Sequence, residues 1–194
     1  MASDVRQRMI DHAVVLLARK GPHGASFNEV LQASGAPRGS LYHHFPGGKE
    51  ELVLAAMDAA ARRAEALLEP VRGQPADKAA EAFIALWRAV LTRSGFEAGC
   101  AVLAVTVTSD SRELRERAAQ IFRTWRALLA GMLSEGGVPV ERAEGLAAML
   151  ISACEGAVAL ARAEGSLAPF ELVMAEQLQA VRGAMIGSPS RRDI

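Results

Sequence analysis

The chain has 194 residues, of which 51% are hydrophobic and 23% charged. These values describe an ordinary globular protein with a sizeable core and one or two domains, and they exclude a disordered chain. The formal net charge is zero, so a basic surface for nucleic acid must arise from local arrangement. Two cysteines, Cys100 and Cys154, are too few and too far apart for a disulfide framework or a zinc site.

The first predicted helix covers residues 4–20. Its apolar side chains recur at helical spacing at Ile10, Ala13, Val14 and Leu17, and Gly21-Pro22 ends it. The N-terminus carries charges and no long apolar core, so it does not have the pattern of a signal peptide.

Residues 26–45 predict two short helices around a tight turn. Ser26 and Glu29 have the spacing of a capping box, and Gly35 suits the left-handed end of the first helix. Pro37 suits the first position of the second helix. Leu41 and Phe45 anchor that helix inward, which leaves a polar face of Arg38, Gly39, Ser40, Tyr42, His43 and His44 outside. Spacing alone fits two readings equally: a helical hairpin packed on a bundle, or a reader of the DNA major groove.

Helical patterns also cover the rest of the chain. Predicted helices span residues 49–68, 76–94, 111–134, 139–164 and 169–185. Residues 99–109 have strand propensity, but no second strand is present to pair with them, so a short helix is predicted there. The expected fold is therefore all-α, with about nine helices.

The run from Gly35 to Phe45 (G-A-P-R-G-S-L-Y-H-H-F), followed by Lys49 and Leu52, resembles the DNA-binding signature of the TetR family of transcriptional repressors. The stretch F-P-G-G-K-E-E-L, with Gly99-Cys100, resembles its LmrA/YxaF-like branch. The resemblance implies a helix–turn–helix domain at residues 1–50 and a ligand-binding and dimerisation domain at residues 51–187. Residues 188–194 are predicted to be a disordered tail.

The DNA contacts are expected within residues 26–49. Arg38 is the candidate for base readout, because its guanidinium fork matches a guanine edge. Tyr42, His44, Lys49 and the helix start at Ser26 are expected to hold phosphates, and His43 a base or a phosphate. The expected partner is a palindromic double-stranded operator bound by a homodimer.

Large aromatic and sulfur-containing side chains cluster in the second predicted domain. Core packing and a ligand pocket explain them equally well, and the family resemblance favours a pocket for an apolar or aromatic effector. The candidate lining residues are Phe83, Trp87, Phe96, Cys100, Phe122, Trp125, Met149 and Cys154. Glu155 is expected at an exposed or interface position. Both cysteines are expected to be buried, inert thiols rather than redox sensors.

Residues 145–161 are too apolar on every side to be covered by the other helices of one chain, which predicts a dimer interface. The candidate interface residues are Ala153, Ala157, Leu160, Phe170, Val173, Met174 and Val181.

Motifs for catalysis or nucleotide binding are absent, and all four histidines lie in the first 44 residues. Enzyme activity, a cofactor, a metal site and a membrane-spanning segment are not expected, and the expected location is the cytoplasm. His43 and His44 point about 100° apart on a helix, which disfavours a shared metal ion. The alternative function is a helical sensor or interaction module whose helix–turn–helix is only structural.

Overall fold

The computed structural model describes residues 2–37 and 39–185, and the predicted tail lies outside them. Within these residues the fold is all-α, as predicted. The nine α-helices are α1 (Ala2–Gly24), α2 (Phe27–Ser34), α3 (Ser40–His44), α4 (Gly48–Leu68), α5 (Ala76–Ser94), α6 (Ala101–Thr108), α7 (Arg112–Glu135), α8 (Val140–Glu164) and α9 (Ala168–Ala184). One 3₁₀ turn, η1 (Glu69–Val71), follows α4.

Two helix ends near the N-terminus differ from the sequence predictions. α1 continues to Gly24, but its backbone breaks at Gly21, where φ is 68°, so the predicted stop is a kink. α3 begins at Ser40 and not at Pro37. The Pro37 carbonyl accepts hydrogen bonds from the Ser40 amide at 3.0 Å and the Ser40 hydroxyl at 2.7 Å, which makes a turn ahead of the helix.

The segment with strand propensity forms α6, as predicted. Ala101, Val102 and Val105 are buried on one face of this helix. The Cys100 sulfur accepts a hydrogen bond from the Leu103 amide at 3.3 Å and so caps the helix start. Burial of one face therefore outweighs the β-propensity of the valines and threonines.

The chain forms two compact units. The first contains residues 1–66 and 90–123, and the second contains residues 67–89 and 124–194. This division does not coincide with residues 1–50 and 51–187, because residues 90–123 pack with the N-terminal helices. The functional division at residue 50 stays a prediction.

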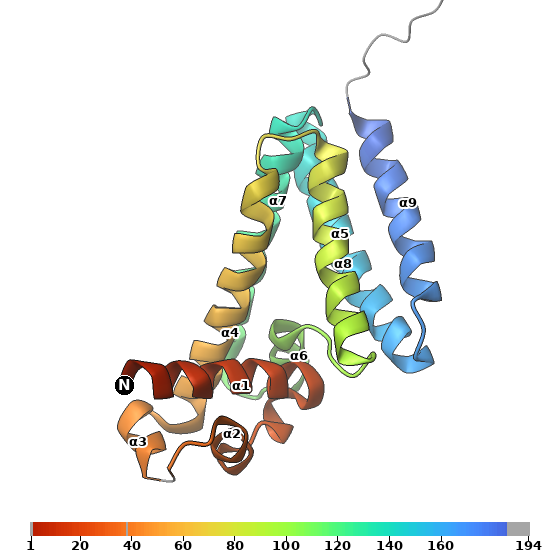
Figure 1. Cartoon of the computed structure of the whole chain (residues 1–194). Coiled ribbons are helices and arrows are strands. Elements are labelled where there is room, and N and C mark those ends of the chain that lie inside the picture. The colour runs from red at the N-terminus through yellow and green to blue at the C-terminus, as the bar shows by residue number, and fades with distance from the viewer. Residues whose placement is uncertain (1, 38, 186–194) are drawn as a thin grey trace, which may run out of the picture. The chain divides into compact units, whose positions relative to one another are not determined.

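In the first unit, α1 packs against α2 and α6 (Figure 1). The Gly99 amide donates a hydrogen bond to the Ala18 carbonyl at 2.8 Å, just before α6. A ring nitrogen of His23 lies 3.2 Å from the carbonyl oxygen of Thr108, at the other end of α6. The two ends of α6 are thus both joined to α1.

In the second unit, α8 and α9 pack side by side (Figure 1). Ion pairs join α9 to α5: Arg88 bonds both carboxylate oxygens of Glu171, at 2.5 and 2.8 Å. Arg182 reaches Glu81 at 2.8 Å. The amide of Ala76 donates to the carbonyl of Gly136 at 3.0 Å, which joins the start of α5 to the end of α7.

Among the described residues, α8 alone is long and apolar enough to cross a membrane by length and composition. Half of its most apolar window is buried within the chain. One face packs against α9, and Glu155 is buried in the middle of the helix. These contacts are those of a core helix with one uncovered face.

Gly136 provides a test of the α5–α7 junction. A Cβ atom there would lie 2.3 Å from the Ala76 nitrogen and 2.7 Å from the Gln74 oxygen, and both are backbone atoms. Gly136→Ala should therefore lower the free energy of unfolding by about 1–3 kcal/mol, as measured by urea denaturation. Gly131→Ala is the control, because a Cβ there meets nothing within 4 Å. It should raise stability by up to about 1 kcal/mol. Equal effects of the two substitutions would contradict this packing.

Candidate nucleic-acid interface

The start of α2 is fixed by the predicted capping box. The Ser26 hydroxyl accepts a hydrogen bond from the Glu29 amide at 3.2 Å, and the Glu29 carboxylate accepts one from the Ser26 amide at 3.1 Å. Lys20 of α1 bonds the same carboxylate at 2.8 Å. Glu29 therefore caps α2 and also ties it to α1.

These contacts favour the ionised form of Glu29. The hydrogen bond from Lys20, followed by those from the amide and hydroxyl of Ser26, lowers the pKa of Glu29 to about 2. The carboxylate thus stays charged through the neutral range. The helix start keeps its cap and its link to α1 under the same conditions.

The turn and α3 follow from three residues. Gly35 adopts the left-handed conformation, with φ of 65°, and its amide bonds the Leu31 carbonyl at the end of α2. Leu41 and Phe45 of α3 are 1% and 0% exposed, so both predicted anchors are in the core. The Arg6 guanidinium of α1 lies 4.9 Å from the centre of the Phe45 ring, at cation–π distance.

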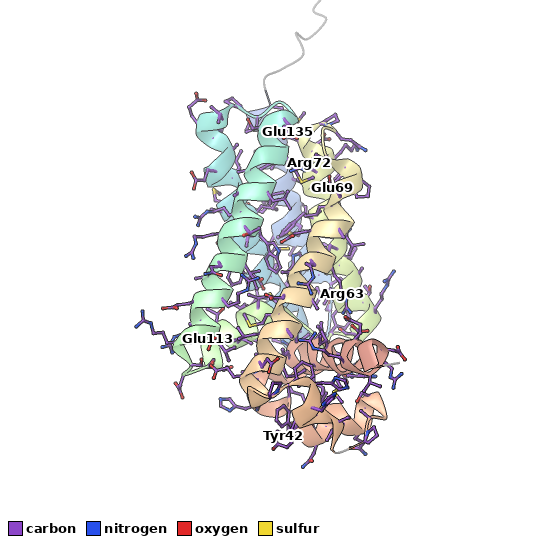
Figure 2. All side chains as sticks on the ribbon, turned by 90° about the vertical axis from the view of Figure 1, so that its left-hand side faces the viewer. Tyr42, Arg63, Glu69, Arg72, Glu113 and Glu135 are labelled. Carbon is purple, nitrogen blue, oxygen red and sulfur yellow. The ribbon has the colours of Figure 1, made fainter. Side chains whose placement is uncertain are left out.

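The outer face of α3 carries the predicted contact residues. Tyr42 is 68% exposed and lies on the outer surface of the unit (Figure 2). Gly39, His43 and Lys49 are exposed as well. Ser26, Ser40 and His44 are half-buried, and the rings of His43 and His44 have centroids 5.2 Å apart. Arg38 lies outside the described residues.

Phe27 contributes to this surface although its spacing predicts a core position. It is half-buried, and its ring meets the Tyr42 ring edge-on with centroids 5.9 Å apart. Phe27 thus holds the exposed tyrosine in place. The contact joins residues fifteen positions apart (42 − 27 = 15) on different helices, so no periodicity within one helix could reveal it.

Polar contacts also fix the start of α4, beside the recognition helix. The Gly47 amide donates to the Glu51 carboxylate at 2.8 Å. The Ser111 hydroxyl, just before α7, bonds the Glu50 carboxylate. Farther along α4, Arg117 of α7 pairs with Asp58 at 2.6 Å, and Arg63 pairs with Asp11 of α1. The reading surface therefore rests on a braced α4.

The predicted pocket residues fall into both compact units. Phe96, Cys100 and Phe122 belong to the first, and the others belong to the second. Phe83, Trp87, Cys100, Trp125 and Cys154 are buried, and Phe96 and Phe122 are half-buried. Met149 is 54% exposed, so its position in a closed pocket was wrong: it points away from the core of its own chain.

Four of the predicted dimer-interface residues are also corrected. Ala157, Phe170, Met174 and Val181 are each at most 2% exposed, because they pack inside the second unit. Leu160 is 50% exposed, and Ala153 and Val173 are half-buried. The exposed apolar residues of α8 and α9 that the prediction missed are Met149 and Leu172, the latter 72% exposed.

The buried sulfur and carboxyl groups complete the second unit. Burial, and secondarily the nearby Glu155 carboxylate, raises the pKa of the Cys154 thiol far above its ordinary value. A thiol in that state is a poor nucleophile. Glu155 is 8% exposed, so its predicted exposed or interface position was wrong. In the described part of the chain, no three metal-ligating side chains gather at one point.

A capped helix, a glycine turn and a short anchored helix with exposed donors define a helix–turn–helix DNA-binding protein. The family model described as bacterial regulatory proteins, tetR family, matches residues 9–56. The model described as transcriptional regulator LmrA/YxaF-like, C-terminal domain, matches residues 76–176. The chain belongs to the TetR family of transcriptional regulators, in its LmrA/YxaF-like branch.

Similar proteins cover nearly the whole chain. An uncharacterized HTH-type transcriptional regulator of Mycobacterium tuberculosis is 38% identical over 175 residues, covering 87% of this chain and 89% of that protein. YxaF of Bacillus subtilis, also named as uncharacterized, is 31% identical and covers 90% and 93%. The crystal structure of a TetR transcriptional regulator from Chloroflexus aurantiacus has a TM-score of 0.78 and 27% identity, covering 95% and 97%.

Glu29→Gln tests the capped start of α2. Because the pKa of Glu29 falls from 4.5 to about 2 on folding, its ionised form stabilises the native state above pH 4.5. This contribution is lost as the pH falls toward 2. The thermal midpoint of the wild type should exceed that of Glu29→Gln at pH 7, and the gap should close between pH 4.5 and 2. Lys20→Gln, which removes one of the partners, should show a smaller gap at pH 7. A gap independent of pH would contradict this role.

Proposed function

We propose that this regulator is a homodimeric repressor that binds a palindromic operator and leaves it when a small molecule binds the second unit. The DNA-binding part rests on one observation: α3 buries Leu41 and Phe45 while it exposes Tyr42 and His43. A short helix held from below, with donors on its free face, suits the major groove.

The contact residues have different roles in this proposal. Arg38 reads a base edge, and Tyr42, His44, Lys49 and the α2 start at Ser26 hold phosphates. His43 contacts a base or a phosphate. Gly39, at the start of α3, lacks a side chain that would keep the backbone from the DNA, and Ser40 adds a hydroxyl beside it.

The second copy is proposed to cover the free faces of α8 and α9. Met149, Leu160 and Leu172 are half or more exposed, although they are large and apolar. Gly156 lies on the exposed side of α8, where a Cβ atom would meet nothing within 4 Å. Glycine weakens a helix by about 1 kcal/mol, so its presence there is better explained by close approach of another molecule than by the fold of one chain. Two identical surfaces of this kind form an isologous dimer.

The effector is proposed to bind in the second unit, near the buried rings of Phe83, Trp87 and Trp125. An effector releases DNA only if it prefers a form of the dimer whose reading heads are wrongly spaced, with a coupling of about 1–3 kcal/mol. A regulator that acts on DNA in this way works in the cytoplasm. The alternative is a helical interaction module whose helix–turn–helix is structural. Steeply salt-dependent binding to duplex DNA separates them, because only the repressor neutralises phosphates.

The roles of Arg38 and Lys49 can be separated by substitution. Arg38→Ala should weaken operator binding by about 1–3 kcal/mol and relax selectivity at one base position of each half-site. Lys49→Ala should weaken operator and unrelated duplexes alike and reduce the slope of affinity against salt. Fluorescence anisotropy at several salt concentrations measures both effects. If Arg38→Ala leaves selectivity unchanged, another residue reads the bases.

Gly156→Glu tests the dimer face. The new carboxylate meets nothing within the chain, so the protomer should fold normally. In a dimer, two buried like charges would face each other, so sedimentation should show monomers at micromolar concentration and operator affinity should fall at least tenfold. The control is Gly131→Glu on α7, another helical glycine with open space at its Cβ, which should stay dimeric. A Gly156→Glu protein that sediments like the wild type would place the interface elsewhere.

A further inference from the structure

The second unit buries a hydrogen-bond donor without an acceptor. Trp87 of α5 is 6% exposed, and its indole Nε1 has no hydrogen-bond partner among the described residues. An indole N–H can only donate, and a buried donor left unbonded costs about 1–3 kcal/mol. An acceptor oxygen supplied by a bound molecule would remove this cost.

The same unit buries a carboxylate. Glu155 of α8 is 8% exposed. Burial of a charge in apolar surroundings is costly unless oppositely charged or donor groups are close. An ionised carboxylate offers about four lone-pair positions, so Glu155 can bond a ligand donor in addition to its contacts within the chain.

The junction of the helices places these groups at neighbouring levels. α5 starts at Ala76, which is bonded to Gly136 at the end of α7. Trp87 lies eleven residues from Ala76 (87 − 76) and Trp125 eleven from Gly136 (136 − 125). At 1.5 Å per residue, both lie about 16 Å from this junction. α5, α8 and the end of α7 extend from it along the second unit (Figure 1).

Glu155 lies slightly farther along. It follows Val140, the first residue of α8, by fifteen positions (155 − 140), which is about 22 Å along the helix. The carboxylate is therefore about one helical turn beyond the level of the two tryptophans. The rings of Trp87 and Trp125 offer faces for an aromatic body, and tryptophan is the best ring for a nearby cation.

We propose that the effector is an aromatic amine whose ring system lies at the level of Trp87 and Trp125 and whose protonated amine pairs with Glu155. An acceptor oxygen on the ring system bonds the Trp87 Nε1. This inference rests on the proposed effector function and assigns its chemical class. It replaces the uncharged ligand expected from sequence, because the carboxylate lies inside the unit.

Two fluorescent probes test the charge directly. Dansylcadaverine has a naphthalene ring, sulfonyl oxygens and a terminal amine on a five-carbon chain long enough to span a helical turn. Dansyl pentylamide is identical except that it lacks the amine. Titration of the dimer without DNA should show dansylcadaverine binding at least tenfold more tightly. Equal affinities, or no binding of either probe, would overturn the proposal without any variant.

Variants then assign the residues. Glu155→Gln should abolish the preference by weakening only the amine probe, while Trp87→Phe should weaken both probes by a similar factor. The control is Glu144→Gln, which removes an exposed carboxylate of the same helix, paired with Arg126, and should leave both affinities unchanged. Circular dichroism checks that each variant is folded. Should Glu155→Gln unfold, Glu155→Asp, which keeps the charge, should retain the preference. A folded Glu155→Gln protein that still prefers the amine would refute the assignment of Glu155.

Release from DNA is measured separately. Addition of dansylcadaverine to the operator complex should dissociate it at concentrations at which the pentylamide does not. Selective binding without release would support the effector class and contradict the proposed release mechanism. Release by uncharged aromatic compounds, with no preference for the amine, would support the mechanism and contradict the class.

Discussion

Burial of Leu41 and Phe45 is the constraint on which the reading surface depends. A helix of five residues has no stability of its own, because nucleation costs more than its few hydrogen bonds return. α3 forms because two side chains on one face are fully buried and Arg6 of α1 covers the Phe45 ring. The same anchoring fixes which residues face outward. Tyr42 and His43 are exposed because their neighbours in the helix are not.

The remainder of the first unit supports that anchoring from several directions. Glu29 caps α2 and bonds Lys20 of α1, so α2 cannot shift without breaking an ion pair as well as its own first turn. Arg117 pairs with Asp58 of α4, and the residues before α6 are bonded to α1. The recognition surface is therefore part of a larger polar and apolar framework that includes α6 and the start of α7.

Local chemistry made much of this predictable from sequence. The capping box at Ser26, the left-handed Gly35 and the anchors Leu41 and Phe45 are set by neighbouring residues, so their prediction was confirmed. Pairings between helices were not predictable. α9 has apolar residues on several faces, and periodicity cannot tell which face packs on α8. Phe170 and Met174 were therefore assigned to an interface but lie in the core. Glu155 was placed outside because charge favours solvent, whereas the packing of the bundle buries it.

The central claim is that two copies of α3, held at a fixed separation, read DNA. Selection of bound duplexes from a random pool by the purified protein tests it most directly. The account predicts enrichment of a palindrome whose half-sites are centred about one helical turn of DNA, or a multiple, apart. Recovery of no common sequence, or of a single half-site without its symmetric partner, would contradict it.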